Sequence, residues 1–349
     1  MDTTLNKTSQ YYRCVGTLSE MNLKREPTKI KLKENGKEVG TANGERIMGN
    51  IAIETEHGVH TFNVYAQNLT TKGEEAKQWK MYCDMLDWNP KIGGNSSEEP
   101  TLVNVEGTVE INDYVGQDGK VKSGLRWKVG RGNTKVTPDD PTGTTLKATL
   151  FIAGMKEEVR NEEETGRLIV TLYGANNNGA CFPVEAIVDE EMADDFANSY
   201  EVGMTVPLEL ELVSRHIGGN KGGKKKFGRS SDVSVNNGFD IQELIIVGGE
   251  DEIEEPDELT TEDEDGNEVE VKTQWINPKT MKLAIKERNN MLEALEKAGY
   301  QPKAKTTNTT KNNLAEAKKA SKVGKVSYPV DDSPFDDSPF DIDDEDFDF

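Results

Sequence analysis

The residues best suited to chemistry in this sequence form a basic, glycine-rich stretch between residues 215 and 229. Six Lys and Arg residues are separated by glycines, with one Phe among them. Basic side chains on a mobile arm can follow a row of phosphates by releasing counterions, and an aromatic ring can stack on a base. The alternative is a solvated loop without a partner. The candidate contacts are Arg215, Lys221, Lys224, Lys225, Lys226, Phe227 and Arg229.

Further candidates for the same chemistry lie in or beside predicted strands. A polar loop over residues 112–122 precedes a strand in which basic residues alternate with apolar ones. Aromatic residues on strands can stack on bases, although a single strand aromatic is more often part of the core. Phe62 and Trp127 alternate with apolar neighbours, so we expect them in the core. The remaining candidates are Arg46, Tyr65, Tyr114, Lys120, Lys122, Arg126, Lys128, Arg131, Arg167, Tyr173 and Phe182.

The sequence contains no arrangement typical of an enzyme or a metal site. Residues 218–225 approach the spacing of a P-loop, but Lys225 stands where a Ser or Thr must ligate magnesium. His57, His60 and Cys83 could supply three metal ligands, but no fourth is evident. We therefore expect no catalytic residues, no metal and no cofactor.

The negative charge of the chain is concentrated in two tracts. The formal net charge is −22 over 349 residues, but residues 250–270 hold thirteen acids and residues 331–349 hold ten, with no Lys or Arg in either tract. Subtracting these 23 negative charges leaves a net charge of +1 for the rest. The overall acidity therefore does not argue against a basic binding surface.

The last nineteen residues combine acids with aromatics. The run Asp-Asp-Ser-Pro-Phe occurs twice, at 331–335 and 336–340, and the chain ends in Asp-Phe-Asp-Phe. Such a segment cannot bury enough apolar surface to fold alone, so we expect disorder. Its carboxylates can occupy a basic groove, and Phe335, Phe340, Phe347 and Phe349 can fill pockets on partner proteins.

Strand patterns indicate two copies of one all-β plan. Each copy has a strand, a hairpin, a short helix-like stretch, a strand, a long polar loop and a last strand. Five strands with a helix between the third and fourth are typical of the OB-fold, a small Greek-key barrel. The expected fold class is all-β, with two tandem OB-fold-like five-stranded barrels followed by a helix and a disordered acidic tail.

The expected domain boundaries follow from these patterns and from composition. They are 10–136 for the first barrel, 144–249 for the second, 250–272 for an acidic spacer, 277–299 for a helix, 300–330 for a flexible lysine-rich linker and 331–349 for the tail. Asn277 and Pro278 form a helix start and Gly299 a helix stop. Docking of this helix on a barrel is favoured over binding to a partner.

The three cysteines are far apart in the sequence, odd in number and without a Cys-x-x-Cys motif, which favours a reducing cytoplasm. No apolar leader opens the chain and no run of 18 apolar residues occurs. We therefore expect neither standard secretion nor a transmembrane span.

The tail and the barrel pattern together resemble single-stranded DNA-binding proteins, especially those of bacteriophages. The two Asp-Asp-Ser-Pro-Phe runs look like the acidic Pro-Phe tail of the bacterial members, and the ending looks like phage tails that finish on an aromatic. Pro-Phe is not terminal here, and one chain holds two barrels, in contrast to the bacterial form.

The resemblance implies binding of single-stranded DNA during replication, recombination or repair in the host cytoplasm. It also implies tail-mediated recruitment of a polymerase, helicase or primase. The alternative is an acidic protein-interaction hub, or a DNA-mimic decoy, that binds no nucleic acid.

Overall fold

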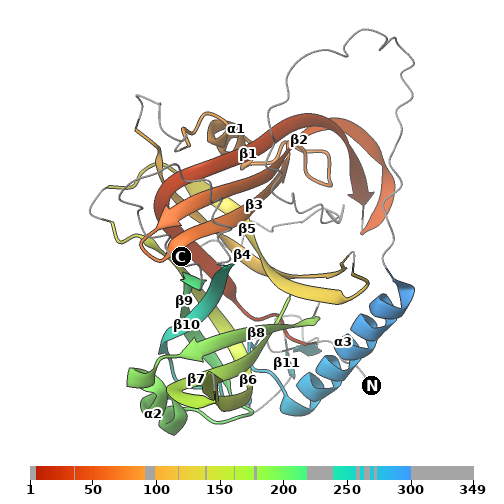
Figure 1. Cartoon of the computed structure of the whole chain (residues 1–349). Coiled ribbons are helices and arrows are strands. Elements are labelled where there is room, and N and C mark those ends of the chain that lie inside the picture. The colour runs from red at the N-terminus through yellow and green to blue at the C-terminus, as the bar shows by residue number, and fades with distance from the viewer. Residues whose placement is uncertain are drawn as a thin grey trace, which may run out of the picture.

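The computed structural model describes residues 5–299 except 35, 91–98, 117, 138–139, 161, 177–178, 218–238, 257–259, 263–267 and 271–272. Most of this part of the chain is β-strand, and Figure 1 shows two barrels, one above the other, with helices on the outside. None of the helices within the described residues is long and apolar enough to cross a membrane.

The first barrel contains the strands β1 to β5. Its strand order is β1-β2-β3-β5-β4, and the pairing of β4 with β1 closes it. The pair β3–β5 is parallel and the other pairs are antiparallel. The elements are β1 (Gln10–Glu34), β2 (Lys37–Thr55), β3 (Gly58–Gln67), α1 (Trp79–Met85), β4 (Leu102–Val115) and β5 (Val121–Asn133).

The second barrel repeats this topology with β6 to β10. Its order is β6-β7-β8-β10-β9, closed by β9 on β6, and again the pair of the third and fifth strands, β8–β10, is parallel. The elements are β6 (Gly143–Arg160), β7 (Glu163–Ala175), β8 (Cys181–Val188), α2 (Glu190–Ser199), β9 (Thr205–Ile217) and β10 (Phe239–Gly249). The predicted pair of OB-like barrels is confirmed.

The two barrels are joined by a strand pair that the sequence patterns did not predict. Residues 10–15 of β1 pair antiparallel with residues 143–148 of β6, which makes one ten-stranded sheet. Tyr12 lies opposite Leu146, and both are buried in a hydrophobic cluster that contains residues of both barrels. Burial of large apolar side chains supplies most of the driving force for such an arrangement.

The aromatic centre of the first barrel consists of Tyr12, Phe62 and Trp127. The ring of Tyr12 stacks on Phe62 and meets Trp127 edge-on, with centroids 5.2 Å apart in both cases. All three residues are buried. The predicted core positions of Phe62 and Trp127 are therefore confirmed.

The first two strands form a long hairpin that the sequence patterns did not predict. The strand β1 runs for 25 residues and β2 for 19, and they form a ribbon that extends beyond the barrel (Figure 1). Most of this extension is polar on both faces, so it lacks the alternation that marks a half-buried strand. Ile30 is buried within this ribbon, and the Lys33 amide donates to the Thr71 carbonyl in the loop after β3.

The acidic segment after the second barrel is partly structured. It begins alongside β9, where the amides of Glu250 and Ile253 donate to carbonyls of Pro207 and Thr205. It then contains a small antiparallel hairpin of β11 (Thr260–Glu262) and β12 (Glu268–Glu270). The expectation of a plain solvated spacer missed these backbone pairings.

The last described element is the helix α3 (Pro278–Ala298), which matches its predicted start and stop. Asn277 caps it by accepting hydrogen bonds from the amides of Lys279 and Thr280, and Gly299 follows its end. Met281 and Ala284 are buried against the second barrel. Docking, the favoured expectation for this helix, is what the structure shows.

A buried histidine at the junction predicts how stability changes with pH. His60 Nδ1 shares a 2.7 Å hydrogen bond with Thr144 Oγ1 of β6, and burial lowers the pKa of His60 to about 4. An unfolded histidine titrates near pH 6.5. Between these values the unfolded chain binds a proton that the folded chain does not, so the free energy of unfolding falls as the pH is lowered through this window.

Urea unfolding of the protein and of a His60→Asn variant across this window measures the effect. Carboxylates titrate in both proteins, so the difference between the two pH profiles isolates the histidine. We expect the variant to lose the His60 part of the slope; identical profiles would contradict the assignment.

Candidate nucleic-acid interface

The strand β5 presents four basic side chains on the outer surface of the first barrel. Trp127 and Val129 point into the core, so Arg126 and Lys128 point outward by the two-residue period of a strand. Lys122 lies on the same face closer to the hairpin tip, and Arg131 lies at the other end. We call this set, Lys122, Arg126, Lys128 and Arg131, the β5 basic face.

A bulge next to Gly107 brings Arg131 into line with the others. Gly107 pairs with Val129, whereas the preceding Glu106 pairs with Arg131, so one extra residue is accommodated in β5. A Cβ at Gly107 would lie 1.8 Å from the Lys128 carbonyl oxygen, so only glycine permits this approach. The bulge therefore shifts the alternation of β5 and turns Arg131 outward.

The tip of the β4–β5 hairpin has two different faces. One face binds α3: the Arg288 guanidinium donates to both carboxylate oxygens of Asp113, whose neighbour across the hairpin is Ser123. Burial alone would raise the pKa of Asp113, but hydrogen bonds from Arg288 and Ser123 outweigh it and hold this pKa below its usual value. The other face carries Tyr114, directly opposite Lys122. The helix thus fixes which side of the hairpin faces outward.

Tyr65 and Arg46 lie beside the β5 basic face. Asn63 of β3 pairs with Lys128 of β5, and Tyr65 is two residues further along β3 on the same side. The Arg46 side chain hydrogen-bonds Tyr65, whose hydroxyl also accepts a 2.7 Å hydrogen bond from Gln67. A partly exposed ring beside cations can stack on a base while the cations contact phosphates.

Carboxylates accompany these cations. Lys128 Nζ lies 2.7 Å from Glu110, and Arg46 lies 2.6 Å from Glu26. Arg126 donates to the side-chain oxygen of Asn112 at 2.7 Å. Ion pairs that remain partly exposed contribute little stability, so a phosphate can take the place of such a carboxylate. The pairs orient the cations without removing them from the surface.

The outer face of the second barrel around Tyr173 on β7 is covered. Tyr173 packs against a cluster in which Phe151 and Cys181 of the barrel meet Met281 of α3. Ile285 of the same helix also packs against this cluster. The helix therefore occupies the place that a nucleic-acid base would need in order to stack on Tyr173. This corrects the prediction for Tyr173, because its ring serves the docking of the helix.

Arg167 and Phe182 are corrected in the same way. Phe182 is 2% exposed in the core, and its ring lies so close to Gly174 that a Cβ there would clash. Arg167 has an 11% exposed side chain that contacts the carboxylates of Glu158, Asp189 and Glu243 at 3.0–3.3 Å. Neither side chain is available to a ligand in this structure.

The other predicted contacts are Lys120, Arg215 and a group of residues that the structure does not describe. Lys120 is exposed at the hairpin tip next to Lys122. Arg215 lies on β9, where it pairs with Ile241. Lys221, Lys224, Lys225, Lys226, Phe227 and Arg229, and the tail residues Phe335, Phe340, Phe347 and Phe349, lie outside the described residues, so their roles stay predictions.

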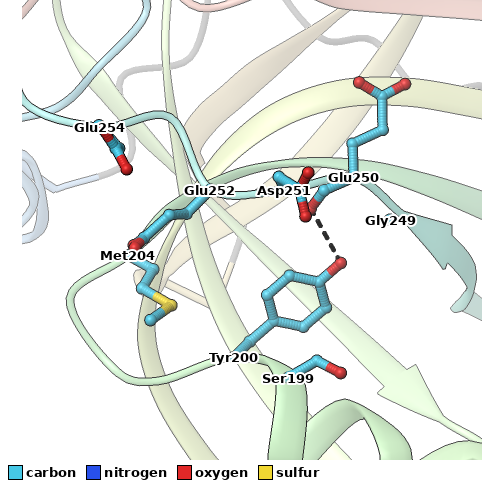
Figure 2. Close-up of a pocket in the computed structure, with 8 residues that line it drawn as sticks. All are labelled: Ser199, Tyr200, Met204, Gly249, Glu250, Asp251, Glu252 and Glu254. Carbon is cyan, nitrogen blue, oxygen red and sulfur yellow. Dashed lines mark hydrogen bonds between the residues drawn. The ribbon is translucent and has the colours of Figure 1, made fainter.

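A cavity beside the end of α2 has the wrong charge for nucleic acid. This cavity of about 890 Å³ lies between the end of α2 and the segment after β10. Figure 2 shows the Tyr200 hydroxyl donating to the Glu250 carbonyl, with the acidic residues along one side of the cavity. Its acidic lining residues are Glu250, Asp251, Glu252 and Glu254. Like charges repel a phosphate backbone, so this cavity is not part of the interface.

Two features of the interface escaped the sequence reasoning. The alternation of residues 105–111 indicates that Glu106 and Glu110 point outward, so the carboxylates beside the basic face could have been found. The contact of Arg288 with Asp113 joins residues 175 positions apart, and no local pattern signals it. Among the described residues, no group of His, Cys, Asp and Glu forms a metal site.

Comparison with known proteins places the chain in a family. The model of the YorF family matches residues 10–290, so the chain belongs to the YorF family. No curated protein sequence matches it.

Solved structures of the single-stranded DNA-binding protein from Thermus aquaticus are similar at low identity. The wild-type protein is 15% identical and covers 72% of this chain and 97% of its own, with a TM-score of 0.37. A deletion mutant of the same protein is 16% identical and covers 72% and 99%, with a TM-score of 0.36. These scores are too low to carry an argument about function.

The position of Tyr65 predicts the effect of removing its ring. Stacking of a base on an aromatic side chain contributes about 1–3 kcal/mol, so Tyr65→Ala should weaken binding of an oligo-dT strand roughly 5- to 150-fold. Tyr65→Phe keeps the ring and loses only the hydroxyl, so it serves as the matched control. Anisotropy of a labelled oligonucleotide measures both; equal affinity of the Ala variant and the parent protein would exclude a stacking role.

Proposed function

We propose that this protein binds single-stranded DNA with little sequence preference through the outer face of its first barrel. The observation that carries the proposal is the β5 basic face with aromatic rings on both sides, Tyr65 on β3 and Tyr114 on β4. Cations spaced along one strand suit a phosphate backbone, and the flanking rings suit unpaired bases. OB-folds bind oligonucleotides with the face of the second and third strands and with the loop between the fourth and fifth, which here carry Arg46, Tyr65 and the tip of the β4–β5 hairpin.

The preference for a single strand follows from the kind of contact. Stacking on a tyrosine requires a base whose face is free, and in duplex DNA the faces are already stacked. Every base has such a face, so the contact tolerates any sequence. The side chains of the β5 basic face are all Lys and Arg, which suit phosphates and carry no sequence information in that role.

The second barrel contributes through its basic loop in this proposal. The strands β9 and β10 that flank residues 218–238 are paired up to Ile217 and Phe239. Apart from Arg215, the predicted basic contacts of this stretch lie in the sequence between these two paired positions. Its lysines extend the phosphate contacts beyond the first barrel.

The acidic tail has two roles in the proposal. Its carboxylates compete with DNA for the basic face, and its phenylalanines recruit a polymerase, helicase or primase when DNA displaces the tail. The setting is replication, recombination or repair of phage DNA in the host cytoplasm. The support is the composition of residues 331–349, with ten acids, four phenylalanines and no basic residue.

The salt dependence of binding tests the basic face. Each phosphate contact on a single strand contributes about 0.7 to the slope of log K against log salt concentration, so Lys128→Ala and Arg126→Ala should each lower the slope by about that amount. Trp79, Trp88 and Trp127 are buried, so a labelled oligo-dT reports binding better than intrinsic fluorescence. Duplex DNA of the same length is the control and should bind much more weakly.

The outcome of that titration decides between the two functional classes. No binding of oligo-dT at low salt, by the full chain and by a tail-deleted chain alike, would favour the protein-interaction hub.

Removal of residues 331–349 tests the role of the tail. If the tail competes for the basic face, the truncated protein should bind oligo-dT more tightly, and the gain should shrink as salt screens the competing charges. A tail with each Phe replaced by Ala is the matched control, because it keeps all ten acids and should behave like the full chain in DNA binding. Equal affinities of truncated and full-length protein at low salt would refute the competition.

A further inference from the structure

Beyond Arg131, the β5 basic face meets further cations on the sheet that joins the two barrels. Glu106 of β4 lies between Arg131 of β5 and Arg13 of β1, each opposite its neighbour in the strand register. Residues opposite each other in antiparallel strands point to the same side. Arg13 therefore lies on the same outer surface as Arg131, two strands away.

The same surface continues onto the second barrel. Tyr11 of β1 pairs with Lys147 of β6, while the neighbouring pair, Tyr12 and Leu146, points into the core. Tyr11 and Lys147 therefore point outward together with Arg13. The sheet runs without interruption through β5, β4, β1 and β6, so no gap separates these side chains.

Both new cations are accessible. The side chain of Arg13 is 51% exposed and that of Lys147 is 70% exposed. Arg13 is oriented by the side-chain oxygen of Asn104 at 3.3 Å and lies 3.9 Å from Glu106, and Lys147 lies 4.0 Å from Glu209. Exposed pairs at such distances are weak, so a phosphate can compete for both cations.

Tyr11 provides a ring between these cations. It is partly buried and hydrogen-bonded to Glu106, and Arg13 and Arg131 are both close enough to act on it electrostatically. Burial, followed by the hydrogen bond to Glu106, raises the pKa of Tyr11, so the phenol stays neutral. A neutral ring beside two cations repeats the combination found at Tyr65.

The fold directs a long single strand of DNA to this surface. The outer face of β7 and β8, and of β6 around Phe151, is occupied by α3 and by Leu5, so a DNA strand that reaches the second barrel there would have to displace the helix. The surface over β4, β1 and β6 requires no such displacement.

We propose that a single strand too long for the first barrel crosses from Arg131 over β1 to β6, with phosphates at Arg13 and Lys147 and a base at Tyr11. This extension rests on the proposed function and names a second part of the same binding site. Its ligand is the phosphodiester backbone of a strand that spans both barrels.

Two oligonucleotide lengths separate the extension from the primary site. One OB-fold occupies roughly 4–16 nucleotides, so oligo-dT of about 8 nucleotides reports the first barrel and oligo-dT of about 30 reports both. The test variant combines Arg13→Gln, which keeps a hydrogen-bond donor for Asn104, with Lys147→Ala. Lys156→Ala is the matched control, because Lys156 is an exposed lysine elsewhere on β6. Circular dichroism during thermal unfolding checks that each variant is folded.

We expect the double variant to bind the short strand like the parent protein and the long strand more weakly, with the salt slope reduced by about 1.4 for two lost contacts. Unchanged binding of the long strand would overturn the extension. Equal weakening on both lengths would overturn it too, because Arg13 and Lys147 would then belong to the primary site. Failure of the parent protein to bind either strand would instead refute the proposed function itself.

Discussion

The pairing of β1 with β6 is the constraint on which the rest of this structure depends. One edge of β1 pairs first with β6 and then with β2, and its other edge pairs with β4. A single strand therefore closes the first barrel and carries the second. The same pairing places Tyr12 opposite Leu146, so the hydrophobic cluster continues from one barrel into the other. Separating the barrels would expose part of this cluster to water and leave the joined edges of β1 and β6 unpaired, and both effects are unfavourable.

The two barrels share a topology but use its outer face differently. Arg46 lies opposite Gln67, the last residue of β3, and Arg167 directly precedes Leu168, which pairs with the last residue of β8. The two arginines thus lie at similar places, at the end of the hairpin that is distant from its turn. Arg46 is 25% exposed beside Glu26, whereas the Arg167 side chain is 11% exposed and contacts Glu158, Asp189 and Glu243. The three carboxylates make Arg167 an internal crosslink, and α3 covers another part of the same barrel.

The helix α3 connects this asymmetry to the candidate interface. Its first half covers the second barrel through Met281 and Ala284, and Arg288 binds Asp113 on the hairpin of the first barrel. A buried guanidinium paired with both oxygens of a carboxylate has a defined geometry. The helix that closes one potential binding surface therefore orients the hairpin that carries Tyr114 and Lys122 on the other.

Local sequence signals determined the elements, and contacts distant in sequence decided their use. The alternation around Val105 to Ile111, the cap at Asn277 and the stop at Gly299 are local, so the barrels and α3 could be predicted from the sequence. Whether Arg167 and Phe182 face solvent depends on neighbours from other strands, and whether Tyr173 is open depends on a helix more than 100 residues away. The alternation of β5 also predicts that Arg126 and Lys128 share a face. The joining of β1 to β6 and the outward position of Arg131 arise from register and from a bulge, which composition and periodicity do not encode.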